Sequence, residues 1–199
     1  LQGRYQGRGT EDSIRDALYR VAGVVSAFVT SNRTDVVDGD GRDPHSVEAV
    51  VTGGTDADVA SVMWGYAGAG IAFYGDTSYS VAGADGKSHT VKFSRPNPTY
   101  AWVEMSNIVV NPEEAVPADQ EAVIAQAISD YGNDFFGLGV NLSRGRVQAA
   151  LNGLLWLADC DLRIATTPTE AGPPTYQTAP IAVSGRNYCT FSISRVAFV

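Results

Sequence analysis

The chain has few charged residues, and its acidic side chains outnumber the basic ones. Only 18% of its 199 residues are charged, and 14 Lys and Arg stand against 22 Asp and Glu, which gives a formal net charge of -8. Proteins that bind along a nucleic-acid backbone need clustered basic residues, so this balance argues against a nucleic-acid partner. No apolar run approaches the roughly 18 residues of a membrane-spanning helix, so we expect no membrane partner either.

Cysteine and histidine are also scarce. Cys160 and Cys189 are the two cysteines, and both lie in apolar, strand-like stretches. This placement predicts buried free thiols, although a disulfide between neighbouring strands stays open as an alternative. His45 and His89 are the two histidines, and the chain has no C-x-x-C or Cys/His cluster. We therefore expect no structural zinc site.

Motifs that carry chemistry are missing as well. The sequence has no G-x-S-x-G nucleophile elbow, no H-E-x-x-H and no G-x-x-x-x-G-K-[ST] phosphate loop. The glycine-rich run from Gly65 to Gly70 follows a predicted helix instead of opening one, so it is typical of a helix end and not of a phosphate site. We predict no catalytic, cofactor-binding or metal-binding residues, although a site assembled from distant residues leaves no motif.

One acidic loop invites a hypothesis of cation binding. Asp35, Asp38, Asp40 and Asp43 lie close together in the sequence. The twelfth residue counted from Asp38 is Ala49, however, whereas an EF-hand needs a bidentate Glu there. We expect a solvated turn, with weak cation binding as the alternative.

The histidines and tryptophans have structural interpretations that compete with functional ones. His45 has an imidazole that titrates near neutrality, but no Asp or Glu stands at a motif-defining distance along the chain. We expect it to order its loop by packing or hydrogen bonding, and we expect His89 to be exposed. Trp64, Trp102 and Trp156 fall in regular elements, which favours packing in a core or domain interface. An exposed stacking platform for sugar is the alternative.

The first half of the chain shows a strand, a helix and a hairpin in succession. Ser46–Thr52 alternates apolar and polar residues, which predicts a half-buried strand. Gly53-Gly54 ends this strand, and Thr55 is placed to cap the next helix. A hairpin turned at Asp85-Gly86 follows. The helix carries one apolar face, formed by Val59, Val62, Met63 and Tyr66.

The second half begins after Arg95-Pro96-Asn97-Pro98, whose prolines predict a rigid linker. We therefore place a domain boundary between residues 1–96 and 97–199. The second unit is expected to run strand, helix, helix, strand, the order of half of a ferredoxin-like sandwich. The predicted fold class is α+β, with tandem small α/β sandwich units and long interstrand loops. The expected elements of the second unit are the strand Tyr100–Val110, the helix Asp119–Tyr131 ended by Gly132, a helix opened by Ser143 and the strand Asp159–Ala165.

A helix followed by a strand occurs near both ends of the chain, which suggests an internal repeat. Thr10 and Ser143 occupy the same position when the two segments are aligned without gaps, and each is placed to cap its helix. A chance likeness between two amphipathic units is the alternative. The repeat predicts that Val24–Ser31 pairs with Ser46–Thr52, and that Asp159–Ala165 pairs with Ile181–Val183 or with Tyr188–Val196.

Two long loops occupy corresponding places in the proposed repeat. They are residues 34–44 (TDVVDGDGRDP) and residues 167–178 (TPTEAGPPTYQT), and both are rich in Asp, Gly, Pro and Thr. Loops of this length in compact domains are often interaction sites or mobile segments. They are the parts of the sequence that we expect to offer surface to partners.

Four local features stand in a distinctive order along the chain. They are Pro44-His45-Ser46, the strand end Val50-Val51-Thr52-Gly53-Gly54, the turn Tyr74-Gly75-Asp76-Thr77 and the segment Val91–Pro96. Their order and spacing resemble one family, the baseplate J-like proteins of contractile-tailed phages and related tail machines. The resemblance covers most of the chain and is firmest before Pro96. The turn Leu157-Ala158-Asp159 departs from it, because the family pattern predicts Pro-Gly-Val there.

This resemblance implies a structural virion protein and not an enzyme. It implies a baseplate wedge component that links the hub to peripheral fibre components and takes part in triggering sheath contraction. The implied partners are other wedge and hub proteins and copies of the chain in a ring. The protein would be made in the bacterial host cytoplasm and located in the tail baseplate of a phage, prophage or tailocin.

Two further expectations accompany the resemblance. Because the chain begins at Leu1 and family members are longer at that end, we expect a C-terminal fragment that is monomeric or weakly self-associating. The alternative function is a tail-associated carbohydrate-binding or cell-wall-degrading protein. That alternative requires a row of exposed aromatic side chains, or a deep pocket containing His45 and aspartates.

Overall fold

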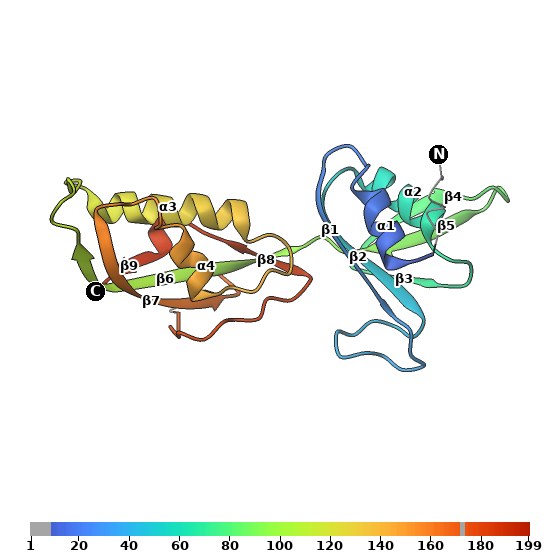
Figure 1. The fold of residues 1–199 in the computed structure, drawn as a ribbon. Helices are drawn as coiled ribbons and strands as arrows, with labels where there is room; N and C mark the ends of the chain where they lie inside the picture. Colours follow the sequence, from blue (N-terminus) through green and yellow to red (C-terminus); the bar gives the residue numbers. More distant parts are fainter. Residues whose placement is uncertain (1–8, 172–173) are drawn as a thin grey trace, which may run out of the picture. The chain divides into compact units, whose positions relative to one another are not determined.

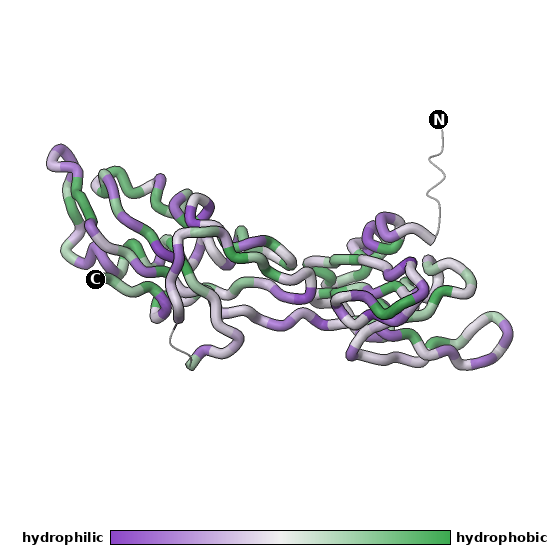
Figure 2. The backbone as a smooth tube through the Cα atoms, turned by 90° about the horizontal axis from the view of Figure 1, so that it is seen from below, coloured by the Kyte–Doolittle hydropathy of each residue, from purple (hydrophilic) through white to green (hydrophobic). Residues whose placement is uncertain are grey.

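The computed structural model describes residues 9–171 and 174–199. The chain divides into two compact units, Leu1–Pro96 and Asn97–Val199. Helices and small β-sheets occur in both units, so the predicted α+β class is confirmed. Figure 2 shows hydrophobic residues (green) interspersed with hydrophilic ones (purple) along each unit, as expected of elements with one buried face. Each unit has its own apolar core.

Unit 1 is built around a mixed sheet (Figure 1). The central strand β2 pairs antiparallel with β1, as predicted, and parallel with β3. Ser94 adds one parallel bridge beside Val50. The described elements are α1 (Glu11–Leu18), β1 (Val24–Asn32), β2 (Ser46–Gly53), α2 (Asp56–Tyr66), β3 (Ala72–Tyr74), β4 (Thr77–Ala82) and β5 (Ser88–Phe93).

The helices of unit 1 begin where the sequence predicts. The Thr10 hydroxyl accepts the Ser13 amide at 3.2 Å, and Thr55 accepts the Asp58 amide at 3.2 Å. Both contacts satisfy amides that a helix start leaves free. Both helices pack on one face of β2, and the predicted β4–β5 hairpin is confirmed. The core of the unit includes Ile14, Leu18, Val47, Ala49, Val51, Val59, Met63, Val91 and Phe93.

The prediction that β2 is half-buried is wrong. Every residue from Ser46 to Val51 is buried, including Glu48 on the face away from the helices. The alternation of apolar and polar residues predicted an exposed face, but the polar residue Glu48 on that face is buried and has a hydrogen-bond partner there. Its carboxylate accepts a hydrogen bond from the Ser94 hydroxyl at 2.6 Å.

Two residues of the family-like motifs hold the end of β2 and the start of the hairpin. Arg95 donates to the carbonyls of Val51 and Gly53 at 3.0 and 2.6 Å, and to the Asp56 carboxylate at 2.6 Å. Its guanidinium thereby ties the strand end to the first turn of α2. Gly75 packs so closely that a Cβ there would overlap the Phe93 carbonyl, so the Tyr74–Thr77 turn requires glycine.

Unit 2 has one long strand, β6, at the centre of its sheet. β6 pairs antiparallel with β7, and its other edge pairs in parallel with β8 and then with β9. The described elements are β6 (Asn97–Val110), α3 (Gln120–Phe135), α4 (Arg144–Ala149), β7 (Leu157–Thr167), β8 (Asn187–Thr190), a short 3-10 helix (Ile193–Arg195) and β9 (Val196–Phe198).

The pairing predicted for the second strand of the repeat is wrong. Asp159–Ala165 lies in β7, which pairs with β6 before it in the sequence and not with residues 181–183 or 188–196. β6 has 14 residues, and its two edges accommodate all the other strands of this sheet. In unit 1, by contrast, β1 follows α1 and pairs with β2, which comes after it in the sequence.

Both predicted helices of unit 2 exist, but their ends differ from the expectation. α3 continues through Gly132 to Phe135, because Gly132 is buried against the Phe191 ring, where a Cβ would overlap it. Here tertiary packing outweighs the low helix propensity of glycine. α4 ends at Ala149, and Ser143 is its N-cap residue, as predicted, but the Ser143 side chain makes no capping hydrogen bond.

Arg195 fills the break between β8 and β9. Its side chain is buried, and its guanidinium donates to the Ala101 carbonyl of β6 at 3.2 Å and to the Thr190 carbonyl of β8 at 3.0 Å. The side chain thus bonds strand carbonyls where the parallel pairing changes from β8 to β9. A third bond, at 2.7 Å, reaches Glu170 in the 167–178 loop.

Candidate functional site

The 34–44 loop projects from the ends of β1 and β2, and it is the best candidate for a functional site (Figure 1). A buried amide, that of Asn32 at the end of β1, organises it. Its nitrogen donates to the carbonyls of Val36 at 2.7 Å, Arg42 at 2.9 Å and Asp43 at 3.1 Å. Its oxygen accepts from the amide and hydroxyl of Thr34. One side chain therefore connects both ends of the loop.

Arg42 connects the loop to the sheet. Its guanidinium donates to Asp38 at 2.7 Å and to Asp40 at 2.8 Å, and its Nη1 lies 3.4 Å from the Glu48 carboxylate. Glu48 has no exposed surface and also accepts from Ser94. Buried charges need such partners, because desolvation is otherwise costly. The network makes the loop an ordered part of the fold.

Asp35, Asp40 and Asp43 are exposed, as expected of a solvated turn, and Asp38 is the exception. Asp38 is half-buried and also accepts the amides of Asp40 and Arg42 at 3.0 and 2.9 Å. Burial by itself would raise the pKa of Asp38. The hydrogen bonds and positive charge of Arg42 outweigh that effect and hold the pKa below its ordinary value of 3.8.

His45 orders the end of the loop through a contact that spacing did not reveal. Its Nε2 lies 2.8 Å from Asp35 Oδ1, and its backbone has a φ of 51°, in the left-handed region that non-glycine residues seldom adopt. Its carbonyl accepts the Ala72 amide at 3.0 Å, where β3 begins. Both members of the His45–Asp35 pair are largely exposed, which limits the strength of the contact.

A shallow hollow of about 280 Å³ lies beside His45. Among the described residues no aspartate lines it, so it differs from the deep pocket with His45 and two aspartates that an enzyme would require. Its lining residues are Asn32, Arg33, His45, Ala69, Gly70 and Ile71.

The ordered loop presents two apolar side chains to solvent. Val36 is 66% exposed and Val37 is 58% exposed. Single exposed apolar residues are ordinary, but these two are neighbours on a loop that buried polar contacts hold in place. We call Val36 and Val37 the valine tip.

The 167–178 loop is also anchored by buried side chains. Thr167 is buried, and its hydroxyl accepts from Trp102 Nε1 at 2.7 Å and donates to the Thr169 carbonyl at 2.7 Å. Glu170 pairs with the buried Arg195, and Gln177 exchanges two backbone hydrogen bonds with Ile164 of β7. Residues 172–173 of this loop lie outside the described residues.

The remaining aromatic and histidine candidates are dispersed over the two units. Trp64 stacks on His89 with ring centroids 4.2 Å apart, and His89 also contacts Asp85 at 3.2 Å. His89 is therefore half-buried, and the prediction that it is exposed is wrong. Trp156 is a core residue, as expected, and Trp102 is half-buried.

Both cysteines are free thiols. Cys189 is buried in the core of unit 2, as predicted, and burial raises the pKa of its thiol to about 11. Cys160 is only half-buried, so the prediction of burial is wrong for it. Burial, followed by the charges of Asp159 and Asp161, raises the pKa of the Cys160 thiol.

Neither a metal cluster nor a membrane-spanning helix occurs among the described residues. Between residues 9 and 171 and from 174 to 199, no three His, Cys, Asp or Glu side chains come together in a way suited to a metal ion. In that same part of the chain, no helix has the length and apolar character needed to cross a bilayer.

The residues that organise the candidate site were missed in the sequence. Asn32, Arg42 and Glu48 belong to no motif, and each has partners outside its own element. One local signal was present: Asp38 and Arg42 are four residues apart and form an ion pair. The sequence-based interpretation of this loop considered only its aspartates. No protein-family model matches the chain, and no curated protein sequence matches it.

Proposed function

We propose that the chain is a structural protein of a contractile tail baseplate, a wedge component of the baseplate J-like kind. Its role would be to link the hub to peripheral fibre components, with other wedge proteins and copies of itself as partners, and to take part in triggering sheath contraction. Its place would be the virion, after synthesis in the bacterial cytoplasm. The sequence resemblance described above is the origin of this proposal.

One observation carries the proposal furthest. The 34–44 loop is fixed by the buried Asn32 and by the Arg42–Glu48 pair, yet its valine tip is exposed. Ordering a loop before binding removes an entropic cost that a mobile loop would meet on association. A loop built in this way suits a scaffold that must hold a partner in one fixed orientation.

The proposal has a finer structural part. We infer that unit 2 is related to half of a ferredoxin-like sandwich, because β6, α3, α4 and β7 follow the order strand, helix, helix, strand. The parallel pairing of β8 and β9 with β6 is an addition to that pattern. An experimental structure of unit 2 that superposes on such a half over β6, α3 and β7 would support the relation, and one that does not would contradict it.

The functional proposal is tested by co-expression of the complete gene product with the products of neighbouring tail genes. Affinity purification followed by light scattering should give a complex of defined mass. Incubation with purified cell walls is the parallel assay for the alternative function. Release of soluble sugar or peptide by the protein, without a complex, would contradict the scaffold role.

A further inference from the structure

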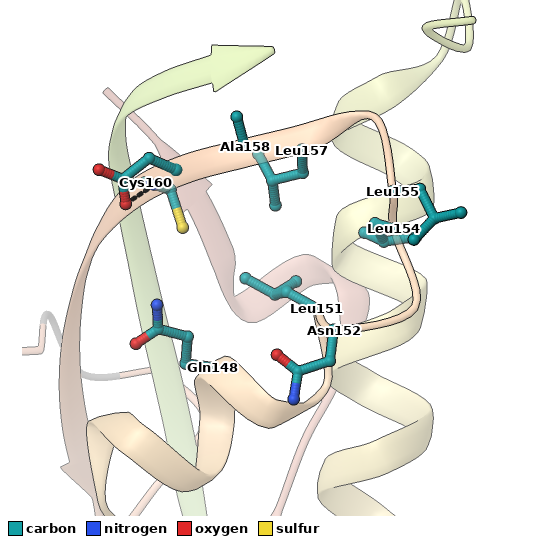
Figure 3. A pocket seen from close by; sticks show the side chains of 9 residues that line it. Gln148, Leu151, Asn152, Leu154, Leu155, Leu157, Ala158 and Cys160 are labelled. Carbon is teal, nitrogen blue, oxygen red and sulfur yellow. Dashed lines mark hydrogen bonds between the residues drawn. The ribbon is translucent and has the colours of Figure 1, made fainter. Parts of the chain in front are cut away.

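The turn after α4 contains the dipeptide Asn152-Gly153, and both residues are exposed. One backbone hydrogen bond closes this turn, from the Leu154 amide to the Leu151 carbonyl at 2.9 Å. Figure 3 shows the Asn152 side chain on the turn, where it lines a pocket of about 280 Å³ together with residues of α4 and β7. The side-chain amide and the backbone nitrogen that follows it therefore lie at the surface, in a segment with few constraints.

Neither of these two groups has a competing partner. Over the described part of the chain, the Asn152 side chain has no hydrogen-bond partner and the Gly153 amide donates to no acceptor. A Cβ placed on Gly153 would meet nothing within 4 Å, so the space around this residue is open. The Gly153 nitrogen is therefore accessible both to solvent and to the side chain that precedes it.

The other asparagines of the chain differ from Asn152. Asn152-Gly153 is the one Asn-Gly pair in the sequence, so every other asparagine precedes a residue with a side chain. Asn133, for example, lies within α3 and precedes Asp134. Its side chain donates to the Phe191 carbonyl at 3.1 Å and accepts the Phe191 amide at 2.9 Å. A free side-chain amide beside an unhindered backbone nitrogen thus distinguishes Asn152.

We propose that Asn152 is a site of spontaneous deamidation in the folded protein. The Gly153 nitrogen loses its proton to base and attacks Asn152 Cγ. A bond forms between these two atoms, and the side-chain nitrogen takes up a proton from water and leaves as ammonia, which gives a cyclic succinimide. Water then opens the ring: cleavage at Cγ gives aspartate, and cleavage at the main-chain carbonyl gives isoaspartate. This inference is independent of the proposed baseplate role.

The turn both permits this reaction and determines its effect. The attack needs freedom of the backbone at Asn152, and exposed turns open locally at little free-energy cost. Isoaspartate lengthens the main chain by one methylene group between Leu151 and Leu154, which both pack in the core of unit 2. That insertion is incompatible with the hydrogen bond between these two residues. Either product also adds a negative charge to a pocket whose wall includes Asp159.

The test incubates the complete chain at mildly alkaline pH, in native buffer and in parallel in guanidinium chloride. Peptide mass spectrometry follows aspartate and isoaspartate at position 152. We expect the native rate to lie within about tenfold of the rate in the unfolded chain, because the turn opens readily. Gly153→Ala should slow the native reaction about tenfold, since its methyl group has open space but hinders the attacking nitrogen. Asn133 should stay unmodified in the native protein, because its side chain is bonded.

Two results would overturn the proposal. If Asn152 stays intact in the native protein while the unfolded chain reacts, the turn protects the site. If Gly153→Ala reacts as fast as the original chain, the Gly153 nitrogen is not the nucleophile. The effect on the turn is tested by thermal unfolding of the separated isoaspartate form. It should unfold at a lower temperature than Asn152→Asp, which has the same charge on an unaltered main chain, and equal unfolding temperatures would contradict the predicted loss of the turn.

Discussion

Arg42 Nη1 lies 3.4 Å from the carboxylate of Glu48, which has no exposed surface. The contact joins a long surface loop to the central strand of unit 1. The same carboxylate accepts from Ser94, at the point where β5 extends the sheet beside β2. The 34–44 loop and the sheet of this unit therefore share one buried carboxylate.

Removing Arg42 should destabilise unit 1 and loosen the 34–44 loop. Arg42→Ala leaves Glu48 buried with only part of its partners, so we expect a loss of about 3 kcal/mol in the free energy of unfolding. Denaturant unfolding with amide hydrogen exchange across unit 1 measures both effects. Arg33→Ala is the control, because the exposed Arg33–Glu11 pair contributes less than about 1 kcal/mol. Equal effects of the two substitutions would contradict the account.

Asp38 should make the loop sensitive to acid. Its folded pKa lies below the unfolded value of 3.8, so its stabilising contribution is complete above about pH 4 and is lost as the pH falls through the lowered folded pKa. NMR titration of the Asp40 and Arg42 amides, which donate to Asp38, measures the transition. Asp38→Asn should abolish this pH dependence. A midpoint above 3.8 would show that the carboxylate is not stabilised as described.

Two glycine-to-alanine substitutions should have opposite outcomes. Gly132→Ala should destabilise unit 2 by about 1–3 kcal/mol, because the added methyl group collides with Phe191. Gly145→Ala, in α4 with open space around it, should be neutral or stabilise by up to about 1 kcal/mol. Thermal unfolding of both variants tests the pair. A stabilising Gly132→Ala would mean that helix propensity, and not contact with Phe191, governs that position.

The two thiols should differ in their reactivity. Cys160 is half-buried and should react with iodoacetamide in the native protein, whereas Cys189, with a thiol pKa of about 11 and little exposed surface, should react only when unit 2 opens. Peptide mass spectrometry after timed labelling measures each rate. Asp159→Asn should speed the Cys160 reaction, because a negative charge that raises its thiol pKa is removed. Equal rates for the two thiols would contradict the packing of Cys189.

Local signals in the sequence were sufficient for much of unit 1. The caps at Thr10 and Thr55, the β1–β2 pairing and the turn at Asp85-Gly86 depend on residues close in sequence, and all are confirmed. In unit 2 the decisive contacts are distant: Phe191 keeps Gly132 inside α3. β7 pairs with a strand some 60 residues earlier, as in the pair Glu104–Arg163.

The candidate site was less accessible to sequence reasoning than the fold. The 34–44 loop was identified by its length and composition, but its order depends on Asn32 and Glu48, which look like ordinary strand residues. Burial of Glu48 could not be predicted, because it follows from Ser94 being placed 46 residues later beside the same strand. Polar residues that meet across elements carry no periodic signal, and this is why the organising contacts were missed.

The most direct test of the central claim is whether the valine tip contacts a tail partner. The complete gene product is co-purified with the neighbouring tail proteins, and complex formation is compared for Val36→Asp with Val37→Asp and for Val116→Asp, an exposed valine in a loop of unit 2. Circular dichroism establishes that each variant is folded. The account predicts that the valine-tip variant loses the complex while Val116→Asp retains it. A complex that survives unchanged in the folded valine-tip variant would contradict the claim.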